Sequence, residues 1–136
     1  METIAKEIEH CRLQSAANDV IGISRMGNQY LNDREPWKLI KKDRGKAAKT
    51  IYVASQFVKA LAIVSAPFIP FSAEELWKTL NLPGTVQEQK WDEALERLPA
   101  SHKIAKAKPL FRKIEADEQK LNETLEKVRE KVAKPD

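Results

Sequence analysis

The sequence predicts an all-α protein: a helix bundle of about five helices, followed by a long C-terminal helix. Composition is the first indication, since only four of the 136 residues are glycine, 42% are apolar and 32% are charged, as in helix-rich soluble proteins. Apolar residues also recur at steps of three and four along several segments. No segment alternates apolar and polar residues for long enough to form a sheet. We therefore expect helix packing on helix.

The first thirty residues show helical periodicity in two pieces, with a break near His10 to Arg12. One continuous helix is the alternative, because the two apolar faces can also be joined into one stripe. The periodicity stops around Asn32 and Asp33, which favour turns, and Pro36 follows.

Proline is tolerated in the first turn of a helix, so residues 36–42 are expected to form a turn followed by a short helix. Trp37 then lies near an exposed helix start. From Arg44 onward an apolar stripe continues for about twenty residues and ends at Pro67, which predicts the central core helix.

Ser72 precedes Glu75 by three residues, a capping-box spacing that predicts a helix from Ala73 to about Leu80. Pro83 and Gly84 then mark a loop. Residues 91–95 are expected to form a single helical turn, and the proline-punctuated stretch after them is expected to be irregular.

The C-terminal residues 114–136 predict a long amphipathic helix, because its apolar positions follow helical spacing among Glu and Lys. The seam consists of Leu121, Leu125, Val128 and Val132. The expected organisation is a helical bundle over residues 1–113 and this helix over residues 114–136, packed on the bundle or leading to a linker.

Several functional classes are excluded by the residues present. There is no glycine-rich phosphate loop, no zinc-protease motif and no nucleophile elbow. One cysteine, Cys11, and two histidines, His10 and His102, cannot supply a four-ligand zinc site. We expect Cys11 to be a small buried residue, and each histidine to lie at the surface or in a structural hydrogen bond.

The chain is also expected to be cytoplasmic and free of membranes. Its longest apolar run, residues 60–71, is interrupted by Ser65 and two prolines, and is shorter than the roughly 20 residues that a bilayer span needs. The N-terminal residues carry early acidic side chains and resemble neither a signal peptide nor a transit peptide.

The strongest functional signal is a basic stretch between Arg34 and Lys49, in which seven Lys and Arg face two acidic residues, a net charge of +5 in sixteen residues. The whole chain carries only +4. Trp37 lies within this stretch, and an indole beside cations is the pairing that single-stranded nucleic-acid sites use. The alternative is that the lysines only solubilise the junction while Trp37 covers the core.

Three runs carry a resemblance to a known family: residues 27–43, with Asn28, Tyr30 and the Pro36-Trp37 pair; residues 61–77, with their proline-phenylalanine break; and residues 102–115, with Pro-Leu-Phe. Together they resemble the C-terminal α-helical anticodon-binding domain of methionyl-tRNA synthetases, class I enzymes, of the archaeal type. The proline-phenylalanine break is shared with the leucine, isoleucine and valine enzymes, whereas the full combination favours methionine.

The resemblance implies that Trp37 stacks on an anticodon base, and that Trp77 and Trp91 pack inside the bundle. Asn28 and Asn32, one helical turn apart, then offer hydrogen bonds to base edges. The expected phosphate-binding residues are the nearby cations Arg34, Lys38, Lys41, Lys42 and Arg44.

The family's two catalytic signatures are absent from these residues, as are an Asn and an Arg that the family carries on a preceding helix. The chain is therefore expected to be a part of the ligase that lacks the family's first helix of this domain. We expect no catalytic or metal residue in it, while ATP and Mg²⁺ serve the full-length enzyme. The implied partners are initiator and elongator methionine tRNA and the catalytic domain of the same protein.

Two alternatives remain open. The terminal seam can pair with a partner helix or with its own copy, which makes the chain a protein-interaction module rather than the expected monomer. The other alternative keeps the RNA role but assigns the domain to a synthetase for leucine, isoleucine or valine.

Overall fold

The computed structural model describes residues 2–111, 122–127 and 129. Up to residue 111 it contains five α-helices, two short 3-10 helices and no strand, so the predicted all-α class is confirmed. In chain order the elements are α1 (Glu2–Glu9), α2 (Leu13–Arg34), α3 (Pro36–Leu39), α4 (Arg44–Ser65), α5 (Pro70–Thr79), η1 (Val86–Glu88) and η2 (Trp91–Leu95).

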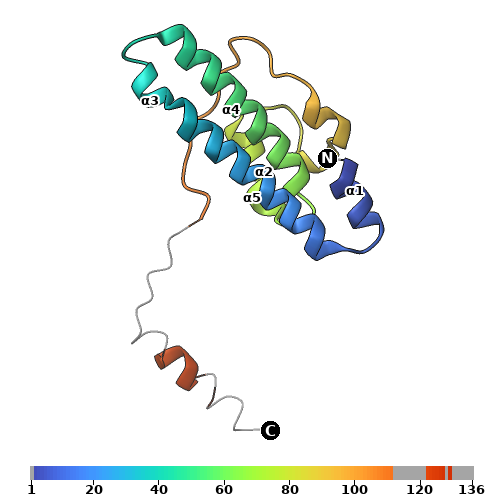
Figure 1. Ribbon diagram of the computed structural model, residues 1–136. Helices are drawn as coiled ribbons and strands as arrows, with labels where there is room; N and C mark the ends of the chain where they lie inside the picture. Colours follow the sequence, from blue (N-terminus) through green and yellow to red (C-terminus); the bar gives the residue numbers. More distant parts are fainter. Residues whose placement is uncertain (1, 112–121, 128, 130–136) are drawn as a thin grey trace.

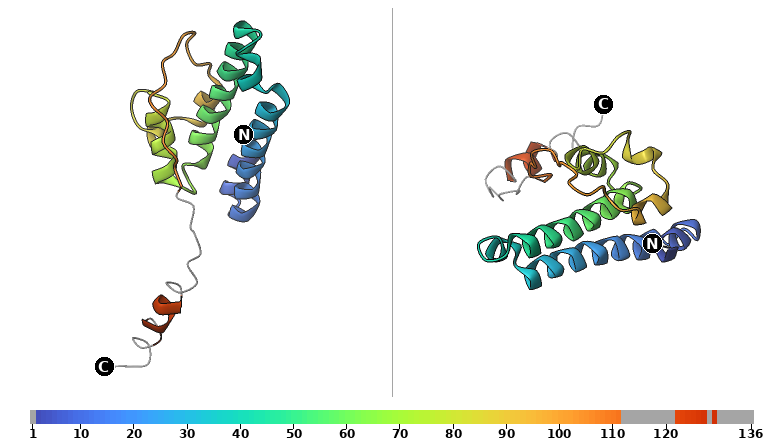
Figure 2. Two further views of the ribbon diagram at one scale, coloured as in Figure 1. Left: turned by 90° about the vertical axis from the view of Figure 1, so that its left-hand side faces the viewer. Right: turned by 90° about the horizontal axis from the view of Figure 1, so that it is seen from above.

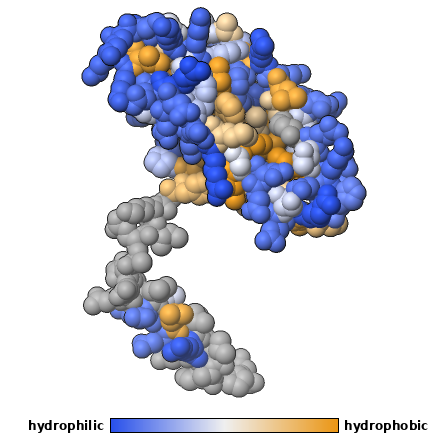
Figure 3. Space-filling view, viewed as in Figure 1, coloured by the Kyte–Doolittle hydropathy of each residue, from blue (hydrophilic) through white to orange (hydrophobic). Residues whose placement is uncertain are grey.

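The long helices α2 and α4 lie side by side, and α4 is the central element of the bundle (Figures 1 and 2). The short α1 packs on α2, whereas α5, η1 and η2 contact the other side of α4. Hydrophilic side chains cover most of the face shown in Figure 3, with apolar patches between them. The two-helix interpretation of the N-terminal residues, with a break at residues 10–12, is confirmed.

Two apolar clusters form the core, and α4 contributes to both. Val64 packs with Ile4, Ala16 and Val20 between α1, α2 and α4. On the other side, Ala62 and Ile63 pack with Ala73, Trp77, Val86 and Ala94 from α5, η1 and η2. Trp91 packs against the first cluster. The expected packing of Trp77 and Trp91 inside the bundle is therefore confirmed.

The bounds of α4 follow from its flanking residues. The carboxylate of Asp43 accepts a hydrogen bond from the backbone N–H of Lys46 at 2.9 Å, which caps the N-terminus of the helix. At the other end Pro67 has no N–H to continue the helical ladder. The predicted helix of about twenty residues is confirmed, with 22 residues from Arg44 to Ser65.

Helix α4 is long and apolar enough to cross a membrane when only its length and composition are considered, with a mean hydropathy of 1.3 over its most apolar part. The core helix of a soluble protein meets the same criteria. In this fold α4 contacts α2, α3, α5 and η2, and it contributes buried residues to both core clusters. It also carries Lys59, which is only 6% exposed and donates from Nζ to the carbonyl oxygen of Glu96. We therefore treat α4 as the core helix.

The prediction for Cys11 is wrong, because its side chain is exposed. Cys11 has a φ of 56° and ends α1, with its N–H bonded to the Ile8 carbonyl and the next N–H, of Arg12, bonded to the Glu7 carbonyl. This is the Schellman arrangement, in which a residue of left-handed conformation follows the helix and faces solvent. The same arrangement ends α5 at Asn81, whose φ is 54°.

The predicted start of α5 is also wrong. The helix begins at Pro70, three residues before the expected Ala73, and Ser72 forms no side-chain cap. Proline at the first helical position sacrifices no hydrogen bond and already has a helical φ, so it starts the helix here.

Most of the predicted C-terminal helix, residues 114–136, lies outside the described residues, including Leu121, Val128 and Val132 and the boundary at residue 113. Residues 122–127 are helical, and Leu125 is 48% exposed. Its packing on the bundle, its pairing with a partner and the expected division into two parts stay predictions.

Candidate nucleic-acid interface

Trp37 stands at a sharp corner between two helices. Glu35 has a φ of 40°, ends α2 through an N–H bond to the Leu31 carbonyl and immediately precedes α3. Pro36 is buried at the first position of α3, and the next side chain, Trp37, remains 53% exposed. Successive helical residues point about 100° apart, so a single turn that buries Pro36 directs Trp37 outward. The expected exposed helix start is confirmed.

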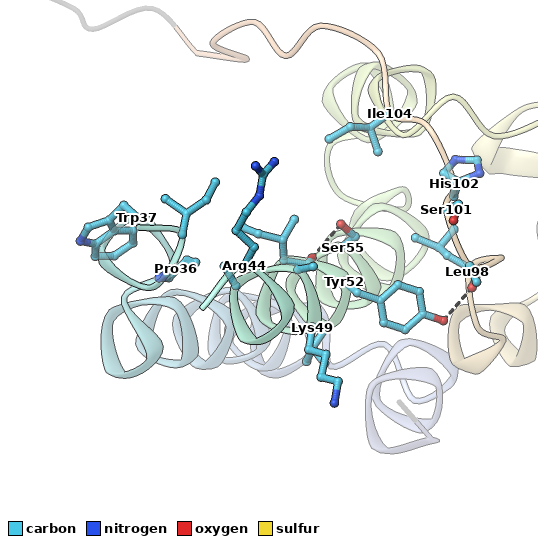
Figure 4. Close-up of a pocket in the computed structure, with 16 residues that line it drawn as sticks. Pro36, Trp37, Arg44, Lys49, Tyr52, Ser55, Leu98, Ser101, His102 and Ile104 are labelled. Atoms are coloured by element: carbon cyan, nitrogen blue, oxygen red, sulfur yellow. Dashed lines mark hydrogen bonds between the residues drawn. The ribbon is translucent and has the colours of Figure 1, made fainter. Parts of the chain in front are cut away.

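Beside this corner an apolar groove of about 1090 Å³ separates α3 and α4 from the segment of residues 98–104 (Figure 4). Trp37 and Ile40 border one end of the groove. Ile51 and Tyr52 line it from α4, and Ile104 lines it from the opposite wall. Arg44, at the start of α4, projects into the space between Trp37 and Ile104 (Figure 4).

The far wall of the groove begins at a segment that three side chains of α4 hold by its backbone. Tyr52 donates from its hydroxyl to the carbonyl oxygen of Leu98 at 2.7 Å, and Gln56 accepts from the N–H of Leu98 at 3.1 Å. Lys59 donates to the carbonyl oxygen of Glu96 at 3.1 Å. Residues 52, 56 and 59 are spaced by four and three, so they lie on one face of α4. We call these three residues the α4 ladder.

The C-terminal end of α5 holds the continuation of this wall. The Nε2 atom of His102 lies 2.5 Å from the carbonyl oxygen of Leu80, and Asn81 donates from Nδ2 to the carbonyl oxygen of Lys103 at 3.3 Å. The N–H of Ala105 donates to the carbonyl oxygen of Thr79 at 2.8 Å. His102 thus has the expected structural hydrogen bond. The ring of His10, with Nδ1 2.6 Å from the carbonyl oxygen of Lys6, has one too.

The five predicted phosphate-binding cations differ in whether they already have a partner within the domain. Lys38 forms an ion pair with Glu35 at 2.5 Å, and the guanidinium of Arg34 lies 5.9 Å from the ring centre of Tyr30. Lys41, Lys42 and Arg44 are exposed, and they form no ion pair within the described part of the chain. Of these five cations, the three at the turn between α3 and α4 are therefore the ones without an ion pair or ring contact in the described residues.

Asp43 lies among these cations without neutralising Lys41, Lys42 or Arg44. The Lys46 backbone N–H bonded to its carboxylate lowers the pKa of Asp43, and the nearby Lys46 ammonium, 3.5 Å away, acts in the same direction. Asp43 is thus held as an anion that serves the start of α4.

Asn28 and Asn32 are exposed on α2, one turn apart as predicted, but they do not line the groove. The inner side of α2 faces α4 through Tyr30, whose ring centre lies 6.0 Å from that of Phe57. Of the predicted site residues, only Trp37 and Arg44 line the groove.

The sequence interpretation did not assign a binding role to residues 96–111, which include the groove-lining residues between 98 and 104 and carry exposed Lys103, Lys106 and Lys108. One signal was present in the sequence, because from Arg97 to Phe111 there are four Lys and Arg and no acidic residue. The apolar lining residues Ile51 and Ile104 are 53 positions apart, so no local pattern joins them.

Comparisons with known proteins identify the family to which this fold belongs. A family profile described as the anticodon binding domain of methionyl tRNA ligase matches residues 1–129. Among curated relatives, the methionine–tRNA ligase of Aeropyrum pernix is 41% identical over 115 residues, which cover 84% of this chain and 20% of that protein. The enzyme of Christiangramia forsetii is 42% identical over 132 residues, covering 92% and 18%.

The methionine–tRNA ligase of Methanobrevibacter smithii is 39% identical over 85% of this chain and 17% of that protein. The chain spans about a fifth of the length of these relatives. The predicted resemblance to methionyl-tRNA synthetases is confirmed. This chain belongs to the family of anticodon-binding domains of methionyl-tRNA ligases.

Proposed function

We propose that this domain binds the anticodon loop of methionine tRNA and thereby selects the tRNA for a methionine–tRNA ligase. The observation that carries the proposal is the exposed indole of Trp37 at the corner before α3, beside unpaired cations. An indole face gives a base a stacking surface, and lysine and arginine side chains hold the adjoining phosphates.

Each residue then has a physical role. Trp37 stacks on an unstacked anticodon base, and Lys41, Lys42 and Arg44 bind phosphates from the α3–α4 turn. Lys38 and Arg34 add to the positive field, although each already has a partner within the domain. Asn28 and Asn32 offer amide groups to base edges from the exposed flank of α2. This division separates the groups that position the RNA from those that read it.

In the whole ligase, tRNA selection by this domain supports the ATP-dependent attachment of methionine, which takes place in a catalytic domain of the same protein. The expected tRNAs are the initiator and elongator methionine tRNAs, which share an anticodon. We propose a cytoplasmic, monomeric protein. ATP and Mg²⁺ belong to the activation chemistry of the whole ligase, and we assign no residue of this chain to them.

The direct test is binding of a fluorescent anticodon stem-loop of methionine tRNA, measured by anisotropy with the parent, Trp37→Phe and Trp37→Ala. Loss of a stacked base costs about 1–3 kcal/mol, so the alanine variant should bind roughly 5 to 150 times more weakly. The phenylalanine variant should retain part of the affinity, because it keeps an aromatic face.

Trp91→Phe is the matched control, because Trp91 packs against the core cluster of α1, α2 and α4. It should leave RNA binding unchanged. Equal affinity of the parent and the Trp37→Ala variant, in this chain and in the intact ligase, would show that Trp37 does not contact the anticodon.

A further inference from the structure

The segment that supplies the far wall of the groove between residues 98 and 104 also carries, there and just beyond, a second basic surface, distant in sequence from the α3–α4 turn. Lys103, Lys106 and Lys108 are all exposed there, and none of them forms an ion pair within residues 2–111. No Asp or Glu occurs between Arg97 and Phe111. The excess positive charge of this segment is therefore not balanced locally.

The position of this segment is fixed by hydrogen bonds to two helices. The α4 ladder holds the backbone at Glu96 and Leu98. The end of α5 holds it at Lys103 and Ala105, through bonds from Asn81 and to Thr79. Lys103 therefore lies within the anchored part of the segment, and Lys106 and Lys108 follow one and three positions after its last bond, at Ala105. Cations on or next to an anchored backbone lose less conformational freedom when they bind an anion than cations on a loose loop would.

The spacing of these lysines suits a repeating anion. Residues 103–108 are not helical. In an extended chain, which rises about 3.3 Å per residue, Lys106 and Lys108 share one side of the backbone about 7 Å apart, whereas Lys103 is about 10 Å from Lys106 and on the other side. Lysine side chains are long and flexible, so cations at these positions can reach successive phosphates of one backbone.

The two basic surfaces lie on opposite sides of the groove. Trp37 and Arg44 border it on the side of α3 and α4, and Ile104, the neighbour of Lys103, borders it on the opposite wall (Figure 4). A polynucleotide with one base on Trp37 therefore has cations on both sides of the groove. Aromatic and cationic groups combined along one track are typical of single-stranded nucleic-acid sites.

We propose that Lys103, Lys106 and Lys108 form a second phosphate-binding rim, which holds the backbone of the same RNA across the groove from Trp37. The inference rests on the proposed function and extends it to a segment far from the basic stretch. Phosphate contacts position the RNA without reading its sequence. The rim therefore contributes affinity and orientation, while base discrimination stays with the α2–α3 side.

The test compares two triple variants of the chain with the same change in charge. One is Lys103→Gln, Lys106→Gln and Lys108→Gln. The control is Lys6→Gln, Arg12→Gln and Lys90→Gln, three exposed cations on α1, before α2 and before η2, outside both basic stretches. Of these, Lys6 is paired with Glu2. Binding of the methionine anticodon stem-loop, and of a stem-loop with altered anticodon bases, is measured over a range of salt concentrations.

Each phosphate contact contributes about 0.7 to the slope of log K against log salt on single strands, so losing three should flatten the slope by roughly 2. We expect that change for the rim variant and little change for the control. The affinity ratio between the two stem-loops should stay as in the parent, because the rim makes no base contact.

An unchanged slope in the rim variant, with normal binding by the parent and weakened binding by Trp37→Ala, would overturn the rim while the proposed function stands. A reduced affinity ratio between the two stem-loops would also overturn it, since the lysines would then read bases. Failure of the parent itself to bind either stem-loop would instead overturn the proposed function. Circular dichroism of both variants establishes that they fold like the parent.

Discussion

Two tryptophans in this domain occupy opposite environments. Trp77 on α5 is 2% exposed, packs with Ala62 and Val86, and donates from Nε1 to the carbonyl oxygen of Pro83 at 3.1 Å. Trp37 on α3 is 53% exposed. Each helix begins with a proline, and Trp37 directly follows Pro36 whereas Trp77 lies seven positions after Pro70. The difference lies in the length of the two helices, ten residues for α5 and four for α3.

A ten-residue helix has room for a buried stripe, and Trp77 shares that stripe with Ala73. The single turn of α3 buries Pro36 and leaves the next position outside. Trp37 therefore belongs to neither core cluster. Its large apolar surface is available to a ligand, whereas that of Trp77 stabilises the fold.

Removing Trp77 is expected to have the largest effect on stability. Trp77→Ala leaves a cavity between α4, α5 and η1 and an unpaired carbonyl on Pro83, so the free energy of unfolding should fall by about 3–5 kcal/mol. Urea denaturation monitored by circular dichroism measures the loss. A decrease below about 1 kcal/mol would mean that Trp77 does not hold α5 to the bundle.

Tyr52→Phe should have an intermediate effect. It removes the hydroxyl that bonds to the Leu98 carbonyl and retains the ring, and a hydrogen bond of this kind contributes about 0.5–1.5 kcal/mol. Hydrogen exchange of the Leu98 amide should become faster, because the wall of the groove is held less firmly. Phe57→Leu, a conservative change on the opposite face towards α2, serves as a control that should leave this amide unaffected. Unaltered exchange in Tyr52→Phe would contradict the role of the ladder.

Trp37→Ala should change stability least among the aromatic substitutions. Surface substitutions away from special features are usually within about 0.5 kcal/mol, so we expect an unfolding free energy close to that of the parent. The same urea titration as for Trp77→Ala gives the comparison. A loss as large as that of Trp77→Ala would identify Trp37 as a lid on the core and remove the contrast between the two sites.

Much of this arrangement could be predicted from sequence, because it depends on local signals. Helical periodicity located α1, α2 and α4, and the corner at Pro36 followed from the chemistry of proline. The capping-box spacing at Ser72 predicted the wrong start for α5, because the helix begins with Pro70, two residues before Ser72. Cys11 was misjudged because the left-handed turn that exposes it depends on where α1 ends.

The groove could not be predicted, since its two walls come from segments about fifty positions apart. Trp37 and the basic stretch were found because they adjoin in sequence. The lysines of the far wall were not, because only the bonds from α4 and α5 bring that segment into place.

The smallest expected effect concerns pH near the start of α4. The backbone bond from Lys46 lowers the pKa of Asp43 below the ordinary value of an aspartate. The carboxylate therefore stabilises the fold above the unfolded-state pKa, and this contribution disappears as the pH falls through the lower folded-state pKa. Asp43→Ala should melt at a lower temperature than the parent at pH 7, and the gap should narrow below about pH 4. A constant gap at all pH values would show that charge is not involved.

The α4 ladder grips main-chain atoms of Glu96 and Leu98, so it does not depend on what side chains the exposed positions there bear. Glu96 and Arg97 can therefore be exchanged for other residues without changing the path of the backbone. The exposed side chains of this segment can thus be changed while its backbone stays in place. The segment is therefore a suitable position for introducing new contacts by protein engineering.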